Sequence, residues 1–171
     1  YSSSAISVEC NIRKSDDIET AIEQTKQELG NIEILVNNAG IGAISRIWEM
    51  SQEDWEQIVD INLNGVFLCT KGVLNHMLEN DVRPGAIVNI GSLNYKAASG
   101  GMSAYSATKA GVSQMAKTVA GEVGRYGIRV NTIAPGSVQK SETETTPLKS
   151  GKSGEEFLNR VVLERRLGQP D

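Results

Sequence analysis

The sequence predicts an α/β fold built on a largely parallel sheet, and three observations support this prediction. Dense apolar runs of strand length, such as residues 32–36 and 86–90, alternate with longer segments of helical periodicity. The runs are apolar at almost every position, as strands of a buried parallel sheet require. Each run ends in small or polar residues that suit a turn.

The length and composition fit one globular domain. A chain of 171 residues is long enough to bury a core. Its content of 39% hydrophobic and 22% charged residues is ordinary for a globular protein. Neither an internal repeat nor a linker interrupts the pattern, so we predict a single domain over residues 1–171.

Charge and hydropathy argue against nucleic-acid and membrane partners. Seventeen basic against 21 acidic side chains give a net charge of −4, and no basic cluster occurs. The longest apolar stretch, residues 65–74, contains Lys71 and is too short to span a bilayer. The two cysteines, Cys10 and Cys69, lie in apolar segments, so we expect buried free thiols and a cytoplasmic protein.

The first part of the chain is predicted to form a strand, a helix and a second strand. Alternating apolar residues predict a short strand at 6–12. Ser15 is a plausible N-cap of the next helix, which keeps helical spacing to Leu29 and ends at Gly30. The dense run at 32–36 predicts the second strand.

The rest of the chain continues this alternation. Ser51 is predicted to be the N-cap of a long helix, and Asp54 three residues later fits a capping box. Apolar residues keep a helical spacing from there to about residue 79. The remaining predicted elements are strands at 86–90 and 128–134 and helices at 103–124 and 154–166.

A tyrosine and a lysine four residues apart indicate chemistry. Tyr105 and Lys109 form a YxxxK pair, which lies on one face of the predicted helix. An ammonium group beside a phenol favours the phenolate. Such a tyrosine can give a proton to a carbonyl oxygen or take one from an alcohol, as hydride exchange with a nicotinamide requires. Taken alone, the pair is equally compatible with an ordinary helix surface.

Polar and small residues follow two of the predicted strands. Ser92 comes after the strand at 86–90, and Asn38, Ala39 and Gly40 come after the preceding strand. In open α/β sheets, ligands bind outside the carboxyl ends of the strands. A hydroxyl there can hydrogen-bond a reacting oxygen, and small residues permit close approach of a flat ligand. Each feature taken alone is also compatible with an ordinary turn.

The order and spacing of these motifs resemble one known family. The motifs are NNAG at 37–40, Asn62-x-x-Gly65, Ser92, YSATK at 105–109 and VNTIAPG at 130–136. Together they are similar to the classical short-chain dehydrogenase/reductase family, over almost the whole chain. The resemblance implies a Rossmann-type, doubly wound parallel sheet in a three-layer αβα arrangement.

The resemblance also implies four catalytic residues. Tyr105 would be the general acid/base, and Lys109 would assist it and hydrogen-bond the nicotinamide ribose. Ser92 would position the substrate oxygen. Asn62 corresponds to the family's helix-kinking asparagine, which holds a water in a proton relay to the lysine. An asparagine in this helical stretch is locally unfavourable, which independently suggests a special role.

Further residues are implied to contact NAD or NADP, and the sequence leaves the preference between the two open. The family often has Asp at the adenine-side position where this chain has Asn11, whose amide oxygen can still accept a hydrogen bond. Besides Tyr105 and Lys109, the implied cofactor contacts are Asn11, Asn38, Ala39 and Gly40 toward the adenosine, and Pro135, Gly136 and Val138 toward the nicotinamide.

Some family segments have no counterpart in this sequence. The glycine-rich phosphate-binding turn, TGxxxGxG, is absent, and we expect that turn, the first strand and the last strand to lie outside residues 1–171. In the family's sheet order, 3-2-1-4-5-6-7, the predicted strand at 6–12 would be the third and that at 32–37 the fourth. Two strands would therefore separate them.

The predicted function is that of an NAD(P)-dependent oxidoreductase interconverting a secondary alcohol and a ketone, of the carbonyl reductase or alcohol, sugar or 3-oxoacyl reductase type. Its expected partners are a small-molecule substrate and further copies of the chain, in a homodimer or homotetramer paired through helices 51–79 and 103–124. No metal is expected, because no cluster of His, Cys and carboxylates occurs in the sequence. Asn94 and Tyr95 are candidates for substrate contact.

Two alternatives stay open at this point: a non-catalytic dinucleotide-binding protein and an inactive fragment on the same fold. The specific substrate and the direction of the reaction also stay open.

Overall fold

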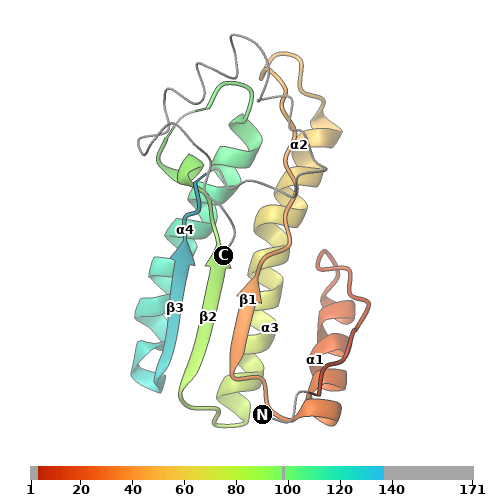
Figure 1. Cartoon of the computed structure of the whole chain (residues 1–171), viewed down its shortest axis with the longest axis vertical. Helices are drawn as coiled ribbons and strands as arrows, with labels where there is room; N and C mark the ends of the chain where they lie inside the picture. Colours follow the sequence, from red (N-terminus) through yellow and green to blue (C-terminus); the bar gives the residue numbers. More distant parts are fainter. Residues whose placement is uncertain (1–3, 98, 137–171) are drawn as a thin grey trace. The chain divides into compact units, whose positions relative to one another are not determined.

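The computed structural model describes residues 4–97 and 99–136 (Figure 1). Tyr1–Ala134 forms one compact unit and Pro135–Asp171 a second, and every element described below belongs to the first unit. The predicted helix at 154–166 lies outside the described residues. The predicted single domain over 1–171 stays a prediction.

In the described part of the chain, three parallel strands form the sheet, in the order β1 (Ile34–Asn37), β2 (Gly85–Ile90) and β3 (Ile128–Ile133). The register sets Asn37 of β1 opposite Asn89 of β2, and Asn89 opposite Thr132 of β3. The predicted α/β fold with a parallel sheet is confirmed, and so are its three strands from residue 32 onward. All three strands end at the same edge, and Asn38 and Ser92 follow the ends of β1 and β2 there.

Helices cover one face of this sheet. They are α1 (Ser15–Leu29), α2 (Gln52–Val59), the π-helix η1 (Asp60–Gly65), α3 (Val66–Glu79) and α4 (Ser103–Val123), with short 3₁₀ helices η2 (Leu93–Tyr95) and η3 (Gly124–Tyr126). In Figure 1, α3 and α4 lie behind the sheet, and α1 packs beside α3. The core between sheet and helices includes Met77 and Ile87, both 0% exposed.

The other face of the sheet is open in the described part of the chain. Side chains alternate between the two faces of a strand, so Leu35 points toward the helices while Ile34 and Val36 point away. Ile34 and Val36 are 63% and 54% exposed. Parallel sheets normally bury both faces. The described residues therefore supply the sheet and one helical layer of the three-layer arrangement.

The predicted strand at 6–12 is wrong. Residues 4–11 belong to no helix or strand, and a turn follows them. The alternation there does reflect burial, because a Cβ added at Gly65 would come within 2.7 Å of the Ile12 side chain. A strand also needs a neighbour for its backbone hydrogen bonds, and among the described residues no strand lies beside this segment.

The predicted helix ends agree with the structure at two positions and differ at one. Ser51 caps α2, and its hydroxyl accepts a hydrogen bond from the Asp54 N–H at 3.0 Å. Gly30 ends α1 with a φ of 88°, a left-handed value that glycine adopts readily. The prediction of Ser15 as N-cap is wrong, because Lys14 is the extended residue at that position and Ser15 is already helical.

None of the helices described in Figure 1 is long and apolar enough to cross a membrane.

Candidate active site

Tyr105 and Lys109 come together one turn apart on α4. The Lys109 Nζ lies 5.6 Å from the centroid of the Tyr105 ring. Tyr105 is half-buried, whereas Lys109 is only 5% exposed. The helix therefore presents the phenol toward the surface and sets the ammonium group behind it.

The Lys109 ammonium group occupies a nearly enclosed position. It donates a hydrogen bond of 2.7 Å to the carbonyl oxygen of Ile90, the last residue of β2. Burial lowers the pKa of Lys109 from its ordinary value, because the charged form loses solvation. No carboxylate forms an ion pair with Lys109 in residues 4–97 and 99–136. An ammonium group has three donors, so it can bind a ligand while keeping its bond to Ile90.

Asn62 is fully buried, at 0% exposure, in the π-helix η1 between α2 and α3. Its Oδ1 accepts a hydrogen bond from the Ile41 N–H at 2.8 Å, and its Nδ2 donates to the Ile41 carbonyl at 2.7 Å. The same Nδ2 lies 3.4 Å from the Thr108 hydroxyl, which donates to the Tyr105 carbonyl at 2.8 Å. One asparagine thus connects the loop after β1 to the helix that carries Tyr105.

Thr108 and Ile41 were missed by the sequence analysis. Thr108 is 1% exposed and stands three residues after Tyr105 in YSATK, a spacing at which its hydroxyl reaches the preceding turn. That spacing was a usable signal. Ile41 gave none, because it contributes its backbone N–H and carbonyl, which every non-proline residue carries.

The loop after β1 passes directly over these side chains. Asn38, Ala39 and Gly40 are exposed. A Cβ added at Gly40 would lie 3.3 Å from the Asn62 Oδ1 and 3.6 Å from the Lys109 Nζ. Glycine therefore keeps the space above the lysine open, and the backbone can approach a ligand closely there.

A buried polar cluster holds the base of this loop. The Asn37 Nδ2 donates hydrogen bonds to the Thr70 hydroxyl at 3.1 Å and to the Asn89 Oδ1 at 2.8 Å. All three residues are buried, and they come from β1, α3 and β2. The sequence analysis placed Asn37 in the NNAG motif without assigning it a role. The structure makes it a link between the two strands and a helix.

Ser92 stands just beyond β2 and is half-buried. It caps η2, and its hydroxyl oxygen accepts a hydrogen bond from the Asn94 N–H at 3.2 Å. The preceding residue must be small, because a Cβ at Gly91 would lie 2.7 Å from the Thr132 Cγ2 and 2.9 Å from the Ile133 carbonyl oxygen. Close packing of β2 against β3 thus fixes the start of the Ser92 turn.

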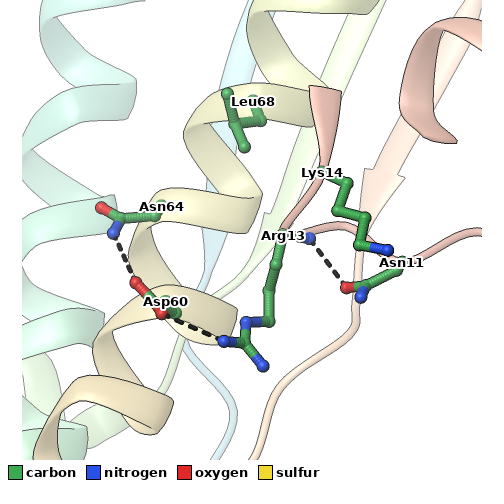
Figure 2. A pocket seen from close by; sticks show the side chains of 6 residues that line it. All are labelled: Asn11, Arg13, Lys14, Asp60, Asn64 and Leu68. Carbon is green, nitrogen blue, oxygen red and sulfur yellow. Dashed lines mark hydrogen bonds and ion pairs between the residues drawn. The ribbon is translucent and has the colours of Figure 1, made fainter. Parts of the chain in front are cut away.

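Asn11 lies beside η1, at an open cavity of about 370 Å³ (Figure 2). Its Oδ1 accepts a hydrogen bond from the Arg13 N–H at 3.1 Å. In Figure 2, Arg13 and Asn64 both point toward the Asp60 carboxylate, at 3.4 Å and 2.9 Å. The cavity is lined by Asn11, Arg13, Lys14, Asp60, Asn64 and Leu68.

The remaining candidates fall in the second compact unit. Pro135 and Gly136 are the described residues of that unit, and Val138 lies outside the described residues. In the part of the chain that the structure describes, no group of three or more His, Cys, Asp or Glu side chains could hold a metal ion.

The chain belongs to the short-chain dehydrogenase family, since the family model described as short chain dehydrogenase matches residues 1–150. It is 39% identical over 167 residues to the 3-oxoacyl-[acyl-carrier-protein] reductase of Synechocystis sp., covering 98% of this chain and 64% of that relative. It is 32% identical over 168 residues to glucose 1-dehydrogenase 2 of Bacillus subtilis, covering 98% of this chain and 64% of the relative.

Solved structures agree with this assignment. A short chain dehydrogenase from Bacillus anthracis is 35% identical, with a TM-score of 0.82 over 95% of this chain and 62% of that one. The resemblance to the family and the Rossmann-type fold are therefore confirmed. The chain spans slightly less than two thirds of the length of these relatives.

Proposed function

We propose that the protein is an oxidoreductase that interconverts a secondary alcohol and a ketone, with NAD or NADP as cofactor. The observation that carries the proposal is the convergence of Tyr105, Lys109 and Asn62 beneath the glycine-containing loop at the carboxyl ends of β1 and β2. This is the part of an open α/β sheet where ligands bind. Family membership supports the same activity.

Tyr105 is the proposed general acid/base. Its half-buried phenol can reach a substrate, and the buried Lys109 ammonium group lies one turn away, with its Nζ 5.6 Å from the centroid of the Tyr105 ring. Ser92 is the proposed partner of the reacting oxygen, since a hydroxyl at the end of β2 can donate to charge that develops there.

Asn62 is proposed to act through its placement. Its side-chain amide is occupied by the Ile41 backbone and Thr108, so it shapes the loop and the wide helical turn. A water that relays protons to Lys109 would then be bound by the backbone of this turn rather than by the Asn62 side chain.

The residues present fit a nicotinamide dinucleotide. The space that a Cβ at Gly40 would fill lies beside the Lys109 ammonium group, which can form further hydrogen bonds. We propose that Lys109 and Tyr105 bind the ribose next to the nicotinamide, and that the bound cofactor supplies or accepts the hydride. The other proposed contacts are Asn11, Asn38, Ala39 and Gly40 on the adenosine side, and Pro135, Gly136 and Val138 beside the nicotinamide.

The proposed substrate is a small alcohol or ketone. The names of the relatives, a 3-oxoacyl-[acyl-carrier-protein] reductase and a glucose 1-dehydrogenase, span two chemistries within this class. We further propose a homodimer or homotetramer paired through helices 51–79 and 103–124. Trp55 and Phe67, which are 36% and 48% exposed on the first of these helices, support this pairing.

A cytoplasmic location is proposed from the cysteines. Cys10 and Cys69 are free, half-buried thiols. Burial raises the pKa of Cys69 to about 11, so its thiolate is scarce at neutral pH. Two unpaired thiols of this kind are typical of proteins from reducing compartments.

The experiment is an absorbance assay of the full-length protein over a panel of ketones and alcohols, with NAD(H) and NADP(H). We expect turnover on part of the panel and a loss of about 100-fold or more in Tyr105→Phe, because the proton donor is removed. Tyr126→Phe is the matched control, since Tyr126 is half-buried in η3 and bonds Arg125. Cofactor binding without turnover, unchanged by Tyr105→Phe, would instead establish a non-catalytic dinucleotide-binding protein.

A further inference from the structure

We propose that Asn94 is a positioning residue that sets the place of the Ser92 hydroxyl relative to Tyr105. The inference rests on the proposed function, because it assumes that Ser92 binds the reacting oxygen. It also assigns Asn94 a role different from the direct substrate contact that its position after Ser92 suggested.

The backbone of Asn94 orients Ser92. The Asn94 N–H donates to the Ser92 hydroxyl oxygen at 3.2 Å, in the first turn of η2. A serine hydroxyl oxygen moves only by rotation about χ1, which has three staggered wells. A hydrogen bond accepted from a fixed N–H selects one of these wells and leaves the hydroxyl proton free to be donated elsewhere.

The side chain of Asn94 connects this turn to the start of α4. Its Oδ1 accepts a hydrogen bond from the Ser99 hydroxyl at 3.3 Å, and its Nδ2 lies 3.4 Å from the Met102 sulfur. Met102 is the N-cap residue of α4, and its carbonyl accepts from the Ser106 N–H at 2.8 Å. Tyr105 lies within that first turn. Asn94 is therefore bonded both to Ser92 and to the cap of the helix that carries Tyr105.

Both ends of the Asn94 amide are engaged within the protein. Asn94 is half-buried, and η2 packs on α4. The contacts with Ser99 and Met102 fix the amide between η2 and the start of α4, as a positioning role requires, although an amide with one partner at each end can form further hydrogen bonds.

The η2 turn does not depend on the Asn94 side chain to form. The Tyr95 N–H bonds the Ser92 carbonyl at 3.1 Å, and the Lys96 and Ala97 N–H groups bond the Leu93 carbonyl at 3.0 and 2.9 Å. Truncating the side chain should therefore leave the turn folded and loosen only its connection to α4. This separation makes the proposal testable by kinetics.

The experiment is a double-mutant cycle on the full-length protein with Asn94→Ala, Ser92→Ala and the double variant. We expect Asn94→Ala to lower kcat about 10-fold in the otherwise unaltered protein, because a small misplacement of a catalytic group is costly. In the Ser92→Ala background the same change should lower kcat less than about two-fold, because no hydroxyl remains to be positioned. The KM for the cofactor should not move.

Ser99→Ala is the matched variant, because it removes one partner of the Asn94 amide and leaves the Ser92 contact in place. It should lower kcat in the same direction by a smaller factor, and it too should have no effect in the Ser92→Ala background. Thermal unfolding of each variant verifies that the fold is kept.

Equal losses from Asn94→Ala in the two backgrounds would overturn the proposal, because Asn94 would then act independently of Ser92. An unchanged kcat in Asn94→Ala would overturn it as well. Absence of turnover in the unaltered protein is a different result, since it would remove the proposed function and the inference together.

Discussion

The two walls of the candidate site are held in different ways. The buried wall consists of Asn62, Ile41 and Thr108. Asn62 and Thr108 are 0% and 1% exposed. The two hydrogen bonds between Asn62 and Ile41 measure 2.7 and 2.8 Å. The open wall consists of the half-buried residues Ser92, Asn94, Ser99 and Met102, joined by contacts of 3.2–3.4 Å.

Because of this difference, substitutions in the two walls should have different effects on stability and on activity. A hydrogen bond lost in a water-free interior leaves its partner unsatisfied, whereas water can replace a bond that is lost near the surface. Changes in the buried wall should therefore destabilise the fold and impair the site together. Changes in the open wall should alter activity with little effect on the free energy of unfolding, so this is the wall where substrate preference can vary.

The largest effect is expected from Asn62→Ala in the buried wall. Both the N–H and the carbonyl of Ile41 lose their partner, and we expect the free energy of unfolding to fall by about 3 kcal/mol. Chemical denaturation of the full-length protein measures this. Asn64→Ala is the matched control, since Asn64 is an exposed residue of the same π-helix that bonds Asp60, and it should cost less than about 0.5 kcal/mol. Equal losses of unfolding free energy in both variants would show that the buried wall contributes no more to stability than an exposed residue of the same helix.

A smaller loss is expected from Thr108→Val, which keeps the shape of the side chain. The hydroxyl that donates to the Tyr105 carbonyl and lies against Asn62 disappears, at a cost of about 1–2 kcal/mol in denaturation. Turnover should fall as well, because Asn62 then loses its connection to the Tyr105 helix. Thr118→Val is the control, because the exposed Thr118 bonds the Gln114 carbonyl on the same helix. A loss as large in Thr118→Val would show that helix effects alone are responsible.

The smallest effect, of opposite sign, is expected from Lys109→Met, which removes the charge behind both walls. Because the folded-state pKa of Lys109 is lowered by burial, the ammonium group opposes folding at pH values below that pKa, and this cost fades as the pH rises through it. The variant should be more stable than the unaltered protein at about pH 7, and the difference should shrink as the pH rises to 10.5, the ordinary pKa of a lysine. Turnover should be lost.

Denaturation curves of Lys109→Met and the unaltered protein at both pH values, together with an activity assay, test whether the variant gains stability and loses turnover. A variant that is less stable at neutral pH would mean that the bond from Lys109 to the Ile90 carbonyl outweighs the desolvation of the charge.

The sequence predicted the elements whose pattern depends on local burial. The runs that became β1 and β2 were visible because they are apolar at almost every position, although the described helices cover only one face of the sheet. The alternating segment at 6–12 gave the same kind of signal, yet it forms no strand. Alternation reports which side chains are buried, whereas a strand also requires a neighbour that local sequence does not reveal.

The candidate site was predictable to a similar degree. Helix geometry alone places Lys109 one turn from Tyr105, and the unfavourable asparagine at 62 does mark the irregular turn η1. The contacts of Asn62 with Ile41 could not be predicted from the sequence, because they involve the backbone groups of Ile41 and do not depend on its side chain. The contacts of Asn94 with Ser99 and Met102 depend on the packing of η2 against α4, and the local sequence does not predict this packing.

The π-helix also has a consequence for insertions and deletions. A π turn contains one residue more than an α turn, and each residue of an α-helix rotates the chain by about 100°. Removing a single residue from Asp60–Gly65 would make the helix from α2 to α3 more regular. Ile58 and Met77, which are 2% and 0% exposed, would then be separated by about 18 residues of regular α-helix, or about five full turns, so both would still face the interior. The π turn thus absorbs one extra residue while the flanking helices keep their buried faces aligned, and this segment should tolerate the loss of one residue better than the gain of one.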